Sequence, residues 1–175
     1  MSPMPIRAFF VVTLAGLSAA GSAFCAEDAP PLTAGQATHI RVDKSERRLD
    51  LIRDGRVFAS FPVALGGAPD GHKQQEGDQR TPEGHYRIDW RNDKSGYHLS
   101  LHISYPNDAD IARADAAGEN PGGMIMIHGQ RNYLGWLAYL TQRFDWTDGC
   151  IAVTNADMDI IWNSVPNGTP IEITP

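Results

Sequence analysis

A strictly alternating stretch constrains the fold more than any other part of this chain. In "HLSLHIS", at 98–104, Leu99, Leu101 and Ile103 alternate with polar side chains. A period of two places the apolar residues on one face of an extended strand, whereas a helix would scatter them around its axis. The stretch therefore predicts a β-strand with one buried face.

Short runs of the same kind recur along most of the chain. Glycine, proline and charged residues separate them, which is typical of strands joined by tight turns. Asp54-Gly55, between two such runs, supplies the positive-φ residue of a hairpin turn. In "HYRIDW", Tyr86, Ile88 and Trp90 are expected on one face. The remaining runs are "THIRVD", "RRLDLI", "RVFASFPVAL", "GGMIMIHG" and "GTPIEITP".

Two stretches near the C-terminal end have helical periodicity instead. "YLGWLAYLTQRF", at 133–144, repeats large apolar side chains at intervals of three and four residues. Residues 158–165 do the same, and Thr154 or Asn155 is expected to cap the start of that helix. The chain therefore predicts a mainly β domain with two short helices.

Residues 1–26 have the pattern of a secretory signal peptide. Arg7 precedes the apolar run "AFFVVTLAGLSAA", which is too short to span a membrane and is followed by small residues. Cleavage is expected after Ala23 or Ala26. An apolar N-terminal core helix is the alternative, but no polar stripe interrupts the run. Cys25 lacks the preceding small residue of a lipoprotein signal, so we expect a periplasmic protein without a lipid anchor.

The rest of the chain is expected to form one domain. Residues 27–37 are predicted to be a linker, because they offer no periodic apolar face, and 38–175 are long enough for a single core. The whole chain has a formal net charge of −6 at pH 7. That charge argues against nucleic acid or an anionic membrane as the main partner, and no membrane span is expected in the mature protein.

Cys150 is the cysteine that remains once the predicted signal peptide is removed. Unpaired thiols are uncommon in oxidising compartments, so this one is either a buried small side chain or a reactive group. Gly149 leaves room beside the sulfur, and His128, next to Gly129, offers the base that a cysteine nucleophile needs. We expect a pair in which the imidazole lowers the pKa of the thiol.

Taken together, these residues resemble the active-site signature of the L,D-transpeptidase catalytic domain family. The resemblance is carried by His128-Gly129, by Thr147-x-Gly149-Cys150, by Asn155 and by the Thr81-Pro82-Glu83-Gly84 turn. It covers residues 38–175. It implies an L,D-transpeptidase-like β-sandwich with two short helices, in which the cysteine lies on a loop beside the sheet.

The resemblance also implies a mechanism. Cys150 would be the nucleophile, His128 the proton donor and acceptor, and backbone amides around Gly149 the oxyanion hole. A carbonyl or hydroxyl near His128 or Thr147 would orient the imidazole. The implied substrate is the peptidoglycan stem peptide. The thiolate attacks the carbonyl of diaminopimelate and expels the terminal D-alanine, and an amine or water then resolves the thioester.

Two positions depart from the family pattern. Asp148 stands where many members have His or Ser, and Ala152 where many have Arg or Asn. The "DWTDGCIA" version is similar to a proteobacterial branch that includes hydrolases detaching lipoprotein from murein, so a murein-linked lipoprotein is a second expected partner. An uncharged Ala152 favours water over an amine acceptor, and arginine there is expected to favour cross-linking. Transpeptidation, hydrolysis and a non-catalytic wall-binding module are the three alternatives.

The remaining polar residues give weaker signals. His98 and His102 share a strand face, but no further ligand accompanies them at metal-site spacing, so neither a metal nor another cofactor is expected. Candidate substrate contacts are His102, Gly129, Trp146 and Asp148. His72 and Lys73 lie in a loop rich in glycine and glutamine and are expected to be exposed.

Overall fold

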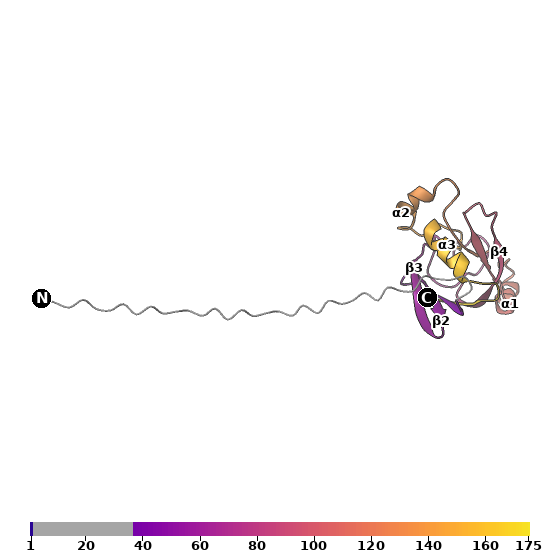
Figure 1. The fold of residues 1–175 in the computed structure, drawn as a ribbon. Coiled ribbons are helices and arrows are strands. Elements are labelled where there is room, and N and C mark those ends of the chain that lie inside the picture. The colour runs from indigo at the N-terminus through magenta and orange to yellow at the C-terminus, as the bar shows by residue number, and fades with distance from the viewer. Residues whose placement is uncertain (2–36) are drawn as a thin grey trace.

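The computed structural model describes Met1 and residues 37–175, and residues 37–175 form a strand-rich body with short helices on its outside (Figure 1). The predicted signal peptide apart from Met1, and the predicted linker apart from Ala37, lie outside the described residues. The strands are β1 (His39–Asp43), β2 (Arg48–Arg53), β3 (Arg56–Pro62), β4 (Gly84–Asn92), β5 (Ser100–Ile103), β6 (Met126–His128), β7 (Ile151–Ala152) and β8 (Pro170–Thr174). The helices are α1 (Asp108–Ala117), α2 (Ala138–Thr141) and α3 (Asn155–Ser164), with a 3-10 turn, η1, at Gly135–Leu137.

The strands form one sheet in the order β3-β2-β1-β8-β4-β5-β6-β7. β4 joins its two halves, because Gly84–Arg87 pair with β8 whereas Ile88–Asn92 pair with β5. The register of β4 shifts between Ile88 and Trp90, which is the kind of bulge that lets a strand pass from one layer to the next. The mainly β, sandwich-like fold expected from the sequence is confirmed.

The alternating stretch forms β5 in the centre of the second half. Leu101 and Ile103 are fully buried, as predicted. The strand is shorter than the pattern suggested, because His98 has a φ of 64° and lies outside it. Ser100, on the other face of the strand, is also buried, and it pairs with His128 of β6. The polar face of this strand is therefore covered at Ser100, whereas His102 is half-buried.

The bulge in β4 corrects one predicted face. Tyr86 and Ile88 are buried, but Trp90 is 37% exposed. The register shift turns the indole away from the core, where it stacks on the imidazole of His102 with 5.0 Å between ring centroids. The hairpin at Asp54-Gly55 forms as predicted, with φ values of 52° and 74°.

The C-terminal helix has the start and the buried face that its sequence predicted. The Thr154 hydroxyl accepts a hydrogen bond from the Asp157 amide at 3.1 Å, and Met158 and Ile161 are fully buried. α3 packs against β5, and so supports the strand beside His128. The other predicted helix is shorter than expected, because within 133–144 only η1 and the four residues of α2 are helical. α1 was not predicted.

The loop between β3 and β4 also differs from expectation. His72 and Lys73 were expected to be exposed, but Lys73 is only 3% exposed. Its ammonium group bonds to Asp78 at 2.8 Å and to the Gln75 carbonyl at 3.1 Å. His72 accepts a hydrogen bond from the Glu83 amide at 2.8 Å. Paired charge and satisfied polar groups make this burial tolerable.

Candidate active site

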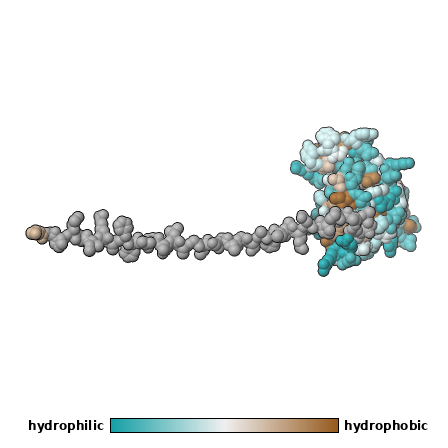
Figure 2. All heavy atoms as spheres, viewed as in Figure 1, coloured by the Kyte–Doolittle hydropathy of each residue, from teal (hydrophilic) through white to brown (hydrophobic). Residues whose placement is uncertain are grey.

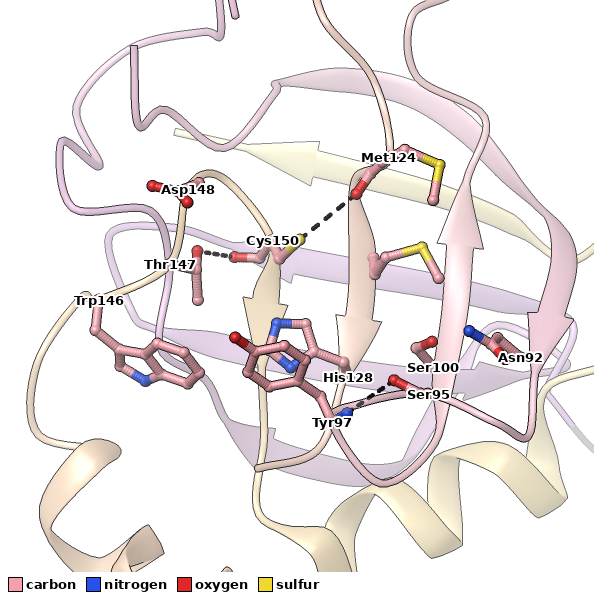
Figure 3. Close-up of a pocket in the computed structure, with 11 residues that line it drawn as sticks. Asn92, Ser95, Tyr97, Ser100, Met124, His128, Trp146, Thr147, Asp148 and Cys150 are labelled. Carbon is pink, nitrogen blue, oxygen red and sulfur yellow. Dashed lines mark hydrogen bonds between the residues drawn. The ribbon is translucent and has the colours of Figure 1, made fainter. Parts of the chain in front are cut away.

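Cys150 and His128 come from neighbouring parallel strands. His128 ends β6 and lies opposite Ala152 of β7, and Cys150 directly precedes β7. Both line a cavity of about 400 Å³ (Figure 3). The other residues of its wall are Asn92, Ser95, Tyr97, Ser100, Met124, Met126, Trp146, Thr147 and Asp148.

The His128 imidazole is held in one orientation. Its Nδ1 lies 2.6 Å from the carbonyl oxygen of Gly129. A carbonyl oxygen can only accept, so Nδ1 carries the proton and the neutral ring keeps Nε2 as its basic nitrogen. The rings of Tyr97 and Trp146 flank the imidazole, with centroids 4.8 Å and 5.8 Å away. Burial lowers the pKa of His128, although the bond to the Gly129 carbonyl opposes the shift, so the neutral base is the resting form.

The lack of space for a side chain at Gly129 explains why a glycine follows the histidine. A Cβ at this position would lie 2.7 Å from the side-chain oxygen of Asn155 and 3.0 Å from the Cβ of His98. The same Asn155 oxygen accepts a hydrogen bond from the Gln130 amide at 2.7 Å. Asn155, part of the sequence signature, therefore holds the turn that carries the carbonyl partner of His128.

Thr147 shapes the loop that carries the thiol. Its buried hydroxyl donates to the Cys150 carbonyl at 2.7 Å and accepts from the Gly149 amide at 3.1 Å. The Thr147 hydroxyl therefore positions the loop that carries Cys150, whereas the Gly129 carbonyl orients the His128 imidazole. The second of these bonds engages the Gly149 amide. Among the described residues, the Cys150 amide has no hydrogen-bond partner.

Gly149 is required by its backbone conformation and by a close contact. Its φ is 117°, which side-chain-bearing residues rarely adopt. A Cβ there would lie 2.5 Å from the carbonyl oxygen of Arg80, which belongs to the loop before β4. The close approach of these two backbone segments places the thiol at the cavity wall.

The pKa of the Cys150 thiol differs from the sequence prediction. The sequence suggested a pKa lowered by His128, but burial, supported by the negative charge of Asp148, raises the pKa of Cys150. The Met126 backbone and Lys73 oppose this shift without reversing it. Because the pKa of His128 is lowered, the two groups rest as a neutral thiol and a neutral imidazole. The proton must move when a substrate arrives.

The candidate substrate contacts fall into two groups. Trp146 and Asp148 line the cavity, and Asp148 is exposed. His102 does not line it, since its Nδ1 lies 2.6 Å from Asp89 and its ring stacks on Trp90. Gly129 contributes through its carbonyl. His98 has a separate partner, Asp159, at 2.8 Å, and in the described part of the chain no three His, Cys, Asp or Glu side chains gather as metal ligands.

Ala152 is a core residue. It is fully buried, and both its amide and its carbonyl bond to Ala64, at 2.8 and 2.9 Å. Ala152 is not among the residues that line the cavity, and the effect of an arginine at this position on cross-linking stays a prediction. The cavity residues that sequence reasoning missed include Tyr97, Ser100 and Met124. Only Ser100 had a signal, since it lies on the polar face of the alternating strand.

A sandwich-like sheet with a histidine at the end of one strand, and a cysteine in a Thr-x-Gly-Cys loop directly before the neighbouring strand, defines the class of L,D-transpeptidase catalytic domains. The model of the YkuD family, described as the L,D-transpeptidase catalytic domain, matches residues 37–173. The chain belongs to this family.

Known relatives agree with this assignment. The chain is 31% identical over 117 residues to "Putative L,D-transpeptidase YafK" of Escherichia coli K12, an alignment covering 63% of this chain and 46% of that protein. The chain thus spans about half the length of the curated relatives it matches.

Solved structures share the fold. The helical cell shape determining protein Pgp2 of Campylobacter jejuni superposes with a TM-score of 0.61 at 23% identity, covering 81% of this chain and 50% of that one. Bd1075 of Bdellovibrio bacteriovorus gives 0.56 at 24% identity, covering 84% and 54%. Within the described residues, no helix has both the length and the apolar character needed to cross a membrane.

Proposed function

We propose that this chain is a periplasmic cysteine enzyme of peptidoglycan remodelling that forms a thioester between Cys150 and the diaminopimelate of a stem peptide. The observation that carries the proposal is the hydrogen bond of His128 Nδ1 to Gly129, which leaves Nε2 as a base in the cavity that Cys150 lines. Family membership supports the peptidoglycan substrate.

Acylation begins with proton transfer. Nε2 of His128 takes the proton of the Cys150 thiol as the sulfur attacks the diaminopimelate carbonyl, and a tetrahedral oxyanion forms. The free Cys150 amide, rather than the engaged Gly149 amide, donates to that oxyanion. The intermediate collapses to the thioester, and the imidazolium returns its proton to the departing amine of D-alanine. Atoms and charges balance without a cofactor.

Deacylation decides between two products. An amine acceptor would give a cross-link, and water would give hydrolysis of a diaminopimelate-linked bond, such as a lipoprotein–murein link. Asp148 favours water, because its exposed carboxylate on the cavity wall repels the carboxylates of an incoming stem peptide. Hydrolysis is therefore the second candidate function.

Incubation with purified murein tests both candidates. Mass spectrometry of the digested murein would show new cross-links for a transpeptidase and released peptides for a hydrolase. Cys150→Ala should abolish either product, and His128→Ala should reduce it strongly, whereas Asp54→Asn in the distant β2–β3 turn should not. Unchanged murein with wild-type protein would instead indicate a wall-binding module.

Export is a separate part of the proposal. The apolar run at 8–20 supports a cleaved signal, so N-terminal sequencing of periplasmic protein should find a start between Phe24 and Glu27. Full-length protein in the cytoplasm would contradict it.

A further inference from the structure

A second recess adjoins the catalytic cavity. It has a volume of about 320 Å³ and shares Tyr97 and Trp146 with that cavity. Leu134, Leu137 and Arg131 are among the residues that complete its wall. The indole nitrogen of Trp146 is buried without a hydrogen-bond partner, and Figure 3 shows it turned away from Cys150. A ligand in this recess would meet the apolar side chains of Leu134 and Leu137 beside the rings of Tyr97 and Trp146.

Large apolar side chains cluster on the segment beyond this recess. We call residues 133–144 the aromatic insert. Three of its rings are strongly exposed: Tyr133 at 97%, Trp136 at 71% and Tyr139 at 67%. Leu134, Leu140 and Phe144 are exposed as well. Figure 2 shows pale residues of intermediate hydropathy at the tip where Figure 1 places α2. Exposed apolar clusters of this kind mark binding surfaces in soluble domains.

Charge narrows the choice of partner. Between Glu119 and Asp145 the sequence has no acidic residue, and it carries Arg131 and Arg143, although the chain as a whole has a net charge of −6. This part of the surface thus suits an anionic partner. Peptidoglycan fits both features, because its stem peptides carry several carboxylates and the sugars of its glycan strands offer C–H faces that pack on the electron-rich faces of aromatic rings.

We propose that the aromatic insert and the adjoining recess bind the glycan strand to which the reacting stem peptide is attached. The proposal rests on the proposed function, because a diaminopimelate at Cys150 has only two residues between it and the sugar. An extended peptide spans at most about 3.3–3.6 Å per residue, so the sugar must lie within about 10 Å of the thiol. The recess that shares Tyr97 and Trp146 with the cavity leads from the thiol to the insert. This surface thereby selects stem peptides that are attached to a glycan strand over free stem peptides.

Two double variants test this surface. Trp136→Ala/Tyr139→Ala removes exposed rings, and Val57→Ala/Ile111→Ala removes apolar side chains that are 46% and 42% exposed on β3 and α1. Both are made in full-length protein with Cys150→Ala, so binding is measured without turnover. The probe is a purified glycan strand from which an amidase has removed all peptides.

The Cys150→Ala protein with an otherwise unchanged surface should bind the bare glycan. The Trp136→Ala/Tyr139→Ala variant, called the ring variant, should bind at least about tenfold more weakly, and the Val57→Ala/Ile111→Ala control should bind as tightly as the unchanged surface. In the active enzyme, the ring variant should lose about the same factor in kcat/KM on intact murein and none on a free stem peptide.

Absent glycan binding, or equal binding by the ring variant, would overturn the proposal. Ring-dependent binding to phosphatidylglycerol vesicles without glycan binding would assign the surface to a membrane, and a ring-dependent dimer in sedimentation would assign it to a second copy. Glycan binding that depends on the rings, in a protein that leaves murein unchanged, would refute the proposed catalysis and not the surface.

Discussion

The Thr147 hydroxyl donates a hydrogen bond of 2.7 Å to the backbone carbonyl of Cys150. Together with the 3.1 Å bond that it accepts from the Gly149 amide, it closes the loop that carries the nucleophile. The sulfur is thus positioned by a side chain three residues earlier in the chain, and the imidazole by a separate carbonyl at Gly129.

Removing the Thr147 hydroxyl should therefore misplace the thiol. Thr147→Val keeps the shape of the side chain but loses both bonds, and we expect kcat/KM on murein fragments to fall about 10- to 100-fold, since small displacements of a reacting atom have effects of this size. The free energy of unfolding should drop by about 1–3 kcal/mol. Thr147→Ser, which retains the hydroxyl, should remain close to wild type in both measurements. Full activity of Thr147→Val would show that the loop does not depend on this hydroxyl.

The pH dependence of thiol alkylation should reflect the raised pKa of Cys150. Burial and the Asp148 carboxylate both disfavour the thiolate, so the rate with iodoacetamide should rise with a midpoint above the roughly 8.5 of an ordinary cysteine. Asp148→Asn removes a negative charge and makes the thiolate easier to form, so its midpoint should move to lower pH. Asp54→Asn, in the exposed β2–β3 turn, is the matched control and should leave the midpoint unchanged. A wild-type midpoint below that of free cysteine would mean that the pair rests as an ion pair.

Local sequence rules were sufficient to predict the elements in which one face is buried or the end is capped. The alternation around Leu101 predicted β5, and Thr154 with the spacing of Met158 and Ile161 predicted α3. These elements follow from period and capping, which depend on neighbours in the chain. The cysteine and its histidine were also predictable, because a family signature specifies both by residue type and order.

Other features depend on contacts between distant segments. Trp90 leaves the core because of a bulge against β5, and Lys73 is buried because Asp78 and a carbonyl satisfy its charge. α1 has weak apolar periodicity; Asp110 and Ala114 are its buried residues, and a capping box at Asn107 starts it. The pKa of Cys150 was predicted with the wrong sign, since the histidine was considered and the desolvation of the loop was not.

Gly149 should tolerate no side chain. In Gly149→Ala the new Cβ would meet the Arg80 carbonyl at 2.5 Å, and φ of 117° is strained for alanine. We expect a loss of about 1–3 kcal/mol from backbone strain, further loss from the clash, and loss of activity. Gly168→Ala is the matched control, because its φ is 88° but no atom lies within 4 Å of the added Cβ. Thermal denaturation of both variants separates the two effects, and equal stability losses would show that the contact with Arg80 is unimportant.

Ala152 should behave as a core position and not as a switch of acceptor. It is fully buried and hydrogen-bonded to Ala64 through both backbone groups, so Ala152→Arg would place a guanidinium in the core without a partner. Such burial costs several kcal/mol, and we expect a large fall in melting temperature together with loss of activity on murein. Val57→Arg, at a site 46% exposed, adds the same charge and should remain stable, and Ala152→Ser should be the milder change at the same site. If Ala152→Arg kept the wild-type melting temperature and increased the ratio of cross-linked to hydrolysed product, the arginine would have to reach the cavity.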